Sequence, residues 1–250
     1  MMRNVSALHL LVRKLEKHVA LEEKDRRLIL DLPHVIQPFR TFDYIIREGE
    51  TPGACPVLIS GFAFRQKLVE SGGRQIISIQ IPGDALDLQQ LFLDYADHNV
   101  QALTDASIAM VPRLALRELA MQRPRIAHAF AVNNQVDASI TREWLLNVGR
   151  RDARTRIAHL LCEVAVRLER QELVGDYGYE LPMSQEQIGD ATGLTSVHVN
   201  RMLRELENDG LITRNSRTIR FPNWPVLKQV ADFNPLYLHV GQQSAVSIPA

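Results

Sequence analysis

The sequence predicts an α+β protein with a β-rich N-terminal domain, one long helix, and a C-terminal domain of short helices with a β hairpin. Three observations predict it. Segments rich in β-branched and aromatic residues alternate with Gly and Pro turn signals from about 35 to 112. A helical pattern follows from 124 to about 148. Beyond it, two short helix patterns flank a glycine and precede a basic strand pair.

Composition restricts the classes of protein to consider. The chain has 250 residues, of which 46% are hydrophobic and 23% charged, as in a soluble protein of two domains. The first apolar stretch is interrupted by charges, so it falls short of the roughly 20 residues that span a membrane. Neither a signal peptide nor a disulfide framework is indicated. We expect a cytoplasmic protein with no membrane partner. Since the net charge is zero, any case for nucleic acid depends on local charge.

The N-terminal part begins with helix and continues as strands. Apolar spacing over 7–31 predicts one helix or two short ones. Turn signals at 52, 72 and 82 then separate segments of strand character. The clearest of these segments are 43–46, 57–68, 74–80 and 108–111. This pattern predicts a small antiparallel barrel or roll.

The long helix carries a periodic row of residues. A short helix is expected over 112–121, and Pro124 suits the first position of the longer one. Six residues recur at steps of four and three: Ile126, Phe130, Asn133, Asp137, Ile140 and Trp144. The row predicts a dimer seam whose polar pair fixes the register, the alternative being a helix packed on its own domain. The basic stretch 150–156 predicts a domain junction.

Residues 183–207 carry the functional signal. Ser184 is a good helix N-cap with Gln187 three residues on, which forms a capping box. Gly193 supplies a left-handed turn residue, and Thr195 caps a second helix. Two short helices joined by such a turn are typical of a helix-turn-helix.

The second helix is expected to read DNA with one face. Its core stripe is Val199, Met202, Leu203 and Leu206. The opposite face has no acid before Glu205, and its Arg and Asn side chains suit bidentate contacts with bases. Residues 211–221 predict a basic β wing that reaches phosphate. The predicted DNA-binding residues are Ser184, Gln185, Thr195, Ser196, Val197, His198, Asn200, Arg201, Arg204 and Arg217.

The segment resembles the DNA-binding domain of the Crp/Fnr family of transcription regulators. The match lies in Ile188-Gly189, Gly193-Leu194 and residues 195–201, and Arg201 falls where the family places a base-reading arginine. The order of β texture, long helix and C-terminal domain is also the family's. The resemblance therefore implies a cyclic-nucleotide-binding-like β-roll, a dimerisation helix and a winged helix-turn-helix. Val197 is a departure, because many members carry a Glu there that can accept from cytosine.

The resemblance implies a domain plan and a mode of action. We expect a β-roll domain with flanking helices over 1–122, a dimerisation helix over 123–149, a winged helix-turn-helix over 150–232 and a tail or frayed end over 233–250. A homodimer would read a pseudo-palindromic operator with recognition helix 195–208 in the major groove, its half-sites about 10 base pairs apart. RNA polymerase is a candidate partner.

The resemblance also bears on ligands. Cyclic-nucleotide members hold phosphate with a Gly-Glu pair and an Arg-Ser pair after the Gly-Asp turn. Here Gly83-Asp84 is followed by Asp87-Leu88 and His98-Asn99, so cyclic AMP binding is not expected. The iron-sulfur branch needs an N-terminal cysteine cluster, and 1–54 contains no cysteine. We expect no cofactor. The effector, the operator, and the choice between activation and repression stay open.

Functions other than DNA binding have less support in the sequence. Cys55, beside a proline, could be an exposed redox thiol or an inert one, and Cys162 is expected in the core. The eight histidines have no metal-ligand spacing. No nucleophile elbow, P-loop or dinucleotide fingerprint is present, so an enzyme is not predicted. The remaining alternative is a cyclic-nucleotide-type regulatory module that acts through protein partners, which would have no use for the basic helix and wing.

Overall fold

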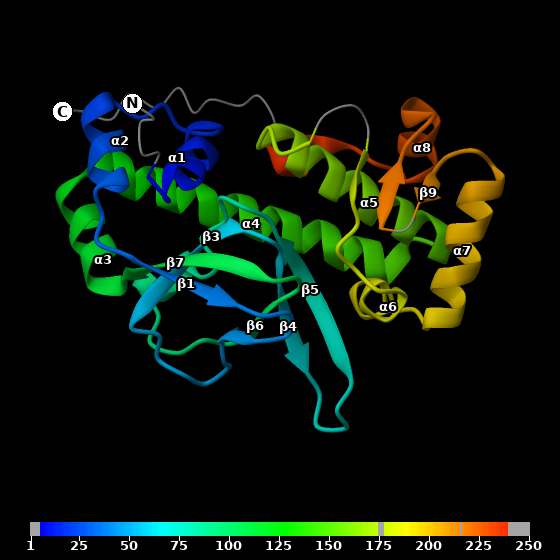
Figure 1. Ribbon diagram of the computed structural model, residues 1–250, viewed down its shortest axis with the longest axis horizontal. Helices are drawn as coiled ribbons and strands as arrows, with labels where there is room; N and C mark the ends of the chain where they lie inside the picture. Colours follow the sequence, from blue (N-terminus) through cyan, green and yellow to red (C-terminus); the bar gives the residue numbers. More distant parts are fainter. Residues whose placement is uncertain (1–5, 175–177, 216, 240–250) are drawn as a thin grey trace. The chain divides into compact units, whose positions relative to one another are not determined.

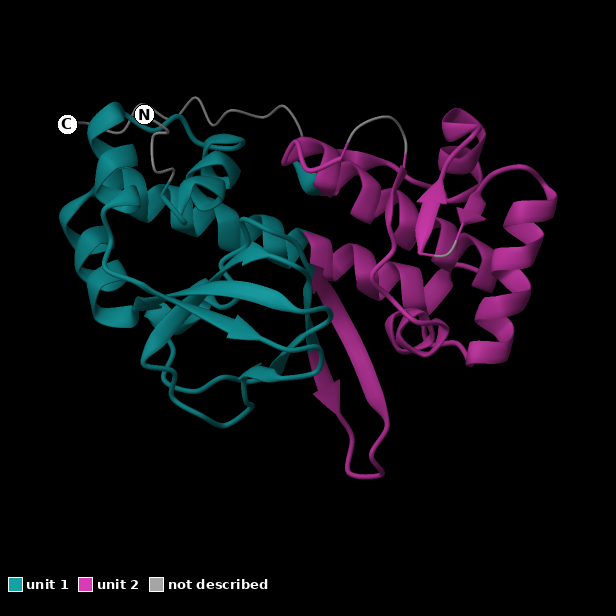
Figure 2. Ribbon diagram, in the orientation of Figure 1, with its two compact units in different colours: residues 1–65, 80–139, 238–250 teal, residues 66–79, 140–237 magenta. Residues whose placement is uncertain are grey.

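A computed structural model describes residues 6–174, 178–215 and 217–239. The chain forms two compact units (Figure 2). The first unit comprises 1–65, 80–139 and 238–250, and the second comprises 66–79 and 140–237. The boundary between them lies within the longest helix, between 139 and 140, and not at the basic stretch 150–156.

Along the chain, helices precede, interrupt and follow the strands of the first unit (Figure 1). They are α1 (His9–Glu16), α2 (Glu23–Leu30), the short 3-10 helix η1 (Leu88–Leu91), α3 (Arg113–Gln122) and α4 (Pro124–Arg150), whose C-terminal part continues into the second unit. The stretch 7–31 therefore holds two short helices. Apolar residues of α1, α3 and α4 form one core with the inner face of two strands.

The strands belong to two antiparallel sheets. They are β1 (Val35–Phe39), β2 (Tyr44–Ile46), β3 (Ala54–Ser60), β4 (Ala63–Leu68), β5 (Arg74–Gln80), β6 (Asn99–Ala102) and β7 (Ala106–Pro112). One sheet has the order β1-β7-β3, in which Met110 faces Val35 on one side and Pro56 on the other. The other has the order β2-β6-β4-β5, and its residues 66–79, at the end of β4 and in β5, are the ones that belong to the second unit. A second core of buried apolar residues lies among these strands.

Two sequence-based expectations for the strands need correction. The segment 57–68 is not one strand, because the chain turns at Gly61 between β3 and β4. Gly61 has φ +81°, and a side chain there would meet the Asp105 carbonyl oxygen at 2.3 Å, so only glycine fits this turn. The segments singled out within 35–112 also did not include β1, whose residues are mostly exposed, or β6.

The second unit combines helices with a small sheet. Its elements after α4 are α5 (Ala153–Arg170), β8 (Gly178–Glu180), α6 (Gln185–Thr192), α7 (Ser196–Asn208), β9 (Thr213–Asn215), β10 (Thr218–Arg220), α8 (Trp224–Val230) and the 3-10 helix η2 (Pro235–Leu238). The sheet has the order β8-β10-β9. The strand pair around 216 was predicted, whereas β8 was not.

A buried carboxylate joins three helices of the second unit. Glu163 on α5 accepts hydrogen bonds from Trp144 Nε1 on α4 at 3.0 Å and from the Tyr237 hydroxyl on η2 at 2.9 Å. Arg167, one turn further along α5, lies 3.3 Å away. Burial raises the pKa of Glu163, and Arg167 opposes that shift. The expectation of a frayed end from 233 is therefore wrong for Phe233 and Tyr237, which are buried; residues 240–250 lie outside the described residues.

Candidate nucleic-acid interface

Helices α6 and α7 are joined by a tight turn with a cap on each side. The Ser184 hydroxyl accepts from the Gln187 backbone N–H, and the Gln187 side chain accepts from the Ser184 N–H, so the capping box is present. Gly193 has φ +67°, the left-handed conformation expected for the turn. Thr195 then caps α7 through its hydroxyl. These contacts fix where α7 begins.

A second glycine lets the two helices approach closely. A Cβ atom at Gly189 would lie 2.4 Å from the carbonyl oxygen of Leu194. The Leu194 N–H donates to the Gly189 carbonyl at 3.0 Å. Because the turn folds back onto α6 at this position, a larger residue would push α7 away. The sequence motif contained Gly189, but only the structure gives the reason for it.

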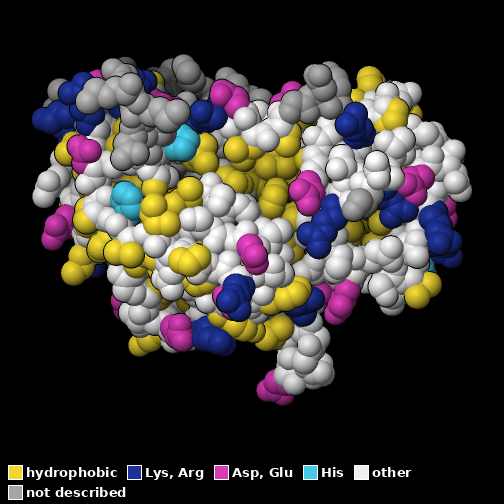
Figure 3. All heavy atoms as spheres, in the orientation of Figure 1, with side chains coloured by type: hydrophobic (Ala, Val, Ile, Leu, Met, Phe, Trp, Pro, Cys, Tyr) yellow, Lys and Arg dark blue, Asp and Glu magenta, His cyan; other side chains and the backbone are white. Residues whose placement is uncertain are grey.

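Helix α7 has an apolar inner face and a polar outer face. The buried residues of α7 are Val199, Met202, Leu203 and Leu206, as predicted. On the other side, Val197 is 77% exposed, and Arg201 and Arg204 are exposed. Figure 3 shows basic side chains in separate groups over the second unit, among polar and acidic ones. A helix thus held by its inner face offers its outer side chains to a groove of duplex DNA.

Local acids restrict which arginines are available. The Arg214 guanidinium lies 2.5 Å from Glu207 and lowers the pKa of that carboxyl. This arginine therefore joins the wing to α7 and is not a free phosphate contact. Arg201 lies 3.9 Å from Glu205 one turn on, and both side chains are largely exposed, which makes a weak pair. Arg217 is exposed on the wing.

The ten predicted DNA-binding residues all lie in the second unit. Those on α7 share its outer side or its first turn, with Asn200 half-buried and the others exposed. Ser184 and Thr195 use their hydroxyls as helix caps, so they position the helices as well. Gln185 is half-buried at the start of α6.

The predicted dimer seam is packed inside its own chain. Ile126 and Phe130 belong to the core of the first unit. Asp137 lies 3.4 Å from Arg65 of β4. Trp144 donates to the buried Glu163, and Asn133 and Ile140 are buried too. In the single chain this row therefore packs the helix on its own domain, which was the alternative to a dimer seam.

A neighbouring row of α4 is open instead. It is displaced by one residue from the predicted seam, keeps the alternating steps of three and four, and consists of Ala131, Asn134, Ala138, Thr141 and Leu145. None of the five is buried, and Leu145 is 74% exposed. Most of its residues are small, which permits close approach of a second helix, and its exposed leucine would gain from burial.

The positions that bear on a ligand in the first unit are closed to solvent. Asp87 and His98 are both buried. Cys55 is buried as well, and burial raises the pKa of its thiol to about 12. Exposure of Cys55 was therefore the wrong alternative, while Cys162 lies in the core as expected, with a raised pKa from burial. Such thiols are poor nucleophiles.

The described parts of the chain indicate neither a metal site nor a membrane span. They hold no group of three or more His, Cys, Asp or Glu side chains arranged to hold a metal ion. None of their helices has the length and apolarity needed to cross a membrane.

The two parts of the chain match two known domain families. Residues 155–230 match the Crp-like helix-turn-helix domain. Residues 36–123 match the cyclic nucleotide-binding domain. The first match includes α6, α7 and the wing, and the second includes the strands and α3.

Relatives match across both parts. The transcriptional activatory protein AadR of Rhodopseudomonas palustris is 30% identical over 169 residues, which cover 67% of this chain and 69% of AadR. The transcriptional activator protein FnrL of Cereibacter sphaeroides is 28% identical over 171 residues, 67% of this chain and 68% of FnrL. The solved structure of FixK2 from Bradyrhizobium japonicum has a TM-score of 0.74 at 26% identity and covers 80% of this chain and 98% of its own.

Proposed function

This chain belongs to the Crp/Fnr family and is a DNA-binding transcription regulator, and on that premise we propose that α7 reads a DNA site through Arg201, Asn200 and Val197. The observation that carries the proposal is the division of α7 into a buried row and an exposed row. An exposed arginine can bond guanine with two donors, and an apolar side chain can touch a thymine methyl group.

The supporting contacts have separate roles. Ser196, His198 and Arg204 flank the reading positions on α7, where they reach neighbouring bases or phosphate. Ser184, Gln185 and Thr195 lie at the starts of the two helices, where backbone N–H groups favour phosphate. Arg217 on the wing adds a phosphate contact without sequence preference.

The reading role is tested by comparing two arginines on a selected site and its single-base variants. Arg201→Ala should weaken binding by about 1 to 3 kcal/mol and relax the preference at one base pair of each half-site. Arg217→Ala should weaken every sequence alike and reduce the salt dependence. Equal, sequence-independent losses for the two variants would refute base reading by α7.

Val197 gives the proposal a gain-of-preference test. A carboxylate in place of this exposed residue could accept from cytosine, which a valine cannot do. Val197→Glu should therefore shift the preferred base at one position of the selected site. Val197→Thr is the matched control, since its methyl group keeps the thymine contact. An unchanged preference in Val197→Glu would remove Val197 from the reading set.

We further propose that the regulator binds as a homodimer joined along the exposed row of α4. Two recognition helices would then meet a pseudo-palindromic operator with half-sites about 10 base pairs apart. The domain plan of 1–122, 123–149 and 150–232 belongs to this proposal, with the last domain extended to include Phe233 and Tyr237, which are buried in the second unit. The buried Asp87 and His98 support a regulator that does not respond to cyclic AMP. RNA polymerase is the proposed partner in transcription, and the cytoplasm the proposed location.

A further inference from the structure

Asp87 is a buried carboxyl group without a close cationic partner. It lies between β5 and η1 and is 1% exposed. Among the described residues, neither of its carboxylate oxygens has a well-formed hydrogen bond, although the Gln89 side chain is close enough to stabilise the ionised form and so to lower the pKa of Asp87. A buried ionised carboxylate needs well-formed hydrogen bonds, so a group in this position gains by holding a proton.

Titratable neighbours on four segments lie near Asp87. Arg65 of β4 and Arg113 at the start of α3 favour its ionised form, whereas Asp97 before β6 opposes it. Cys55 on β3 is also near enough for Asp87 to disfavour its thiolate. Burial is the largest influence and raises the pKa of Asp87 to about 6, against the pull of Arg65.

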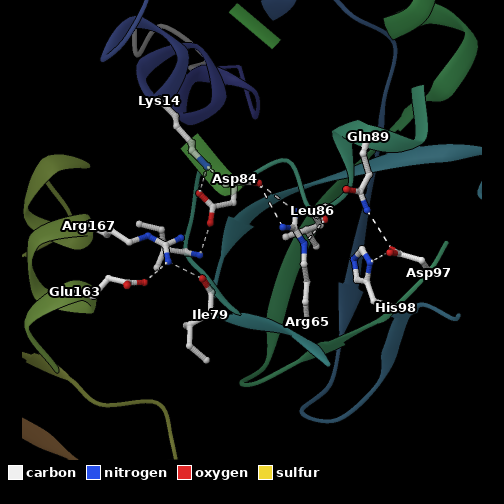
Figure 4. A network of polar contacts seen from close by, with 12 residues as sticks. Lys14, Arg65, Ile79, Asp84, Leu86, Gln89, Asp97, His98, Glu163 and Arg167 are labelled. Atoms are coloured by element: carbon white, nitrogen blue, oxygen red, sulfur yellow. Dashed lines mark hydrogen bonds and ion pairs between the residues drawn. The ribbon is translucent and has the colours of Figure 1, made fainter. Parts of the chain in front are cut away.

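The two arginines are already committed elsewhere. Arg65 donates from Nε at 3.0 Å and from Nη2 at 2.7 Å to the Leu86 carbonyl oxygen, next to Asp87 in sequence (Figure 4). Its contact with Asp137 of α4 is longer, at 3.4 Å. Arg113 donates to the Leu93 carbonyl oxygen at 3.0 Å. Arg65 is thus placed beside two carboxyl groups and bonds neither of them closely.

Lys14 extends the same network to α1. Its ammonium group lies 2.8 Å from Asp84 (Figure 4). The same group lies 4.0 Å from Asp137. At the other end, His98 Nδ1 lies 2.6 Å from Asp97. Each cation named here has a carboxylate or carbonyl partner other than Asp87. A negative charge on Asp87 has the neutral Gln89 side chain beside it, and any cation that it attracts must leave an existing contact.

We propose that Asp87 is a proton-operated switch in the first unit. While Asp87 is protonated, Arg65 stays in contact with Asp137 of α4. When Asp87 loses its proton, it competes with Asp137 for Arg65. The competition is favoured by the long Arg65–Asp137 contact. Because Asp137 lies on α4 and Arg65 on β4, the proton changes how strongly the long helix is held to the sheet. The device acts within one unit and does not depend on the DNA-reading role of α7.

The direct test follows the carboxyl groups of the full chain by carbon-13 NMR, with Asp87→Asn to assign the signal. Asp87 should titrate with a midpoint near pH 6. Hydrogen exchange of the α4 amides around 137, corrected for the intrinsic pH dependence, should become several-fold faster between pH 5 and 7.5. Asp87→Asn should lose this acceleration. Asp94→Asn, which changes an acid of the same segment whose side chain is 83% exposed, should keep it.

A second variant tests the competition from its other side. In Asp137→Asn, Arg65 is released toward Asp87, so the Asp87 midpoint should fall. This variant also decides the matter if Asp87→Asn does not fold. The proposal is overturned if Asp87 is ionised throughout the range, if Asp87→Asn and the parent chain share one exchange profile, or if the midpoint is the same in Asp137→Asn.

Discussion

Leu145→Ala is the substitution that best tests which of the two rows of α4 forms the dimer interface. Leu145 is 74% exposed in the single chain, and full burial of a leucine side chain contributes about 1.5 to 3 kcal/mol. Covering the exposed part in a dimer would therefore contribute about 1 to 2 kcal/mol per chain, or about 2 to 4 kcal/mol per dimer. At about 1.4 kcal/mol per factor of ten, Leu145→Ala should weaken the dimer about 30- to 1,000-fold.

Sedimentation equilibrium over a range of protein concentrations measures this constant. Leu146→Ala is the matched control, because Leu146 is next to Leu145, is 44% exposed and lies off the row. This variant should change the dimer dissociation constant little. Ile140→Ala removes a residue buried in its own chain, so it should lower the free energy of unfolding by about 2 to 5 kcal/mol. If Leu145→Ala leaves the dimer constant unchanged, the exposed row is not the interface.

The remaining predictions concern stability and are measured by urea unfolding. Gly189→Ala forces a Cβ atom to 2.4 Å from a carbonyl oxygen and should lower the free energy of unfolding by about 1 to 3 kcal/mol. Gly149 on α4 has open space around it, so Gly149→Ala should raise the free energy of unfolding by about 0.5 to 1 kcal/mol. Equal effects of the two substitutions would contradict the close approach at Gly189. Glu163→Ala leaves a buried Trp N–H, a Tyr hydroxyl and an arginine without their partner, so it should lower the free energy of unfolding by about 3 to 5 kcal/mol. Glu163→Gln should lower it less. An unchanged stability of Glu163→Ala would show that Glu163 does not hold these three groups together. Arg214 lowers the pKa of Glu207, so their pair stabilises the fold above the unfolded pKa of about 4.3 and is lost as pH falls through the folded value. Glu207→Gln should be less stable than the parent at pH 7 and equal to it near pH 2, and a gap that persists in acid would exclude this linkage.

The local features of the second unit were predictable because they depend on neighbours in sequence. The capping box at Ser184, the left-handed turn at Gly193 and the buried stripe of α7 all follow from residue types a few positions apart. The pairing of Arg214 with Glu207 was not predictable. It joins a strand to a helix, and only the fold shows that this wing arginine is occupied.

The row on α4 shows a different limit. Periodicity identified its apolar face correctly, but it cannot tell a face that meets a second chain from one that meets its own domain. The large residues of the predicted row, such as Phe130 and Trp144, are needed inside the chain. The open row one residue on is mostly small, so hydrophobicity alone gave it no weight.

The strands were harder to predict than the helices. β1 is an edge strand with exposed Val35 and Ile36, so it lacks the alternation that marks a half-buried strand. The break between β3 and β4 depends on the approach of Asp105 from a distant loop. The lack of a close cation at the Asp87 oxygens likewise depends on where Arg65 and Arg113 are held, which no local pattern contains.

The separation of α7 into two faces has a consequence for how such a regulator can change its targets. Residues that hold the helix in place, such as Val199 and Leu203, are different from those that point outward, such as Val197 and Arg201. An outward residue can be exchanged at little cost in stability, since it leaves the core untouched. A duplicated copy of this chain could therefore acquire a new operator through a few outward substitutions while keeping one unaltered scaffold. A library randomised at the outward positions should fold as often as the parent and differ mainly in the sequences it selects.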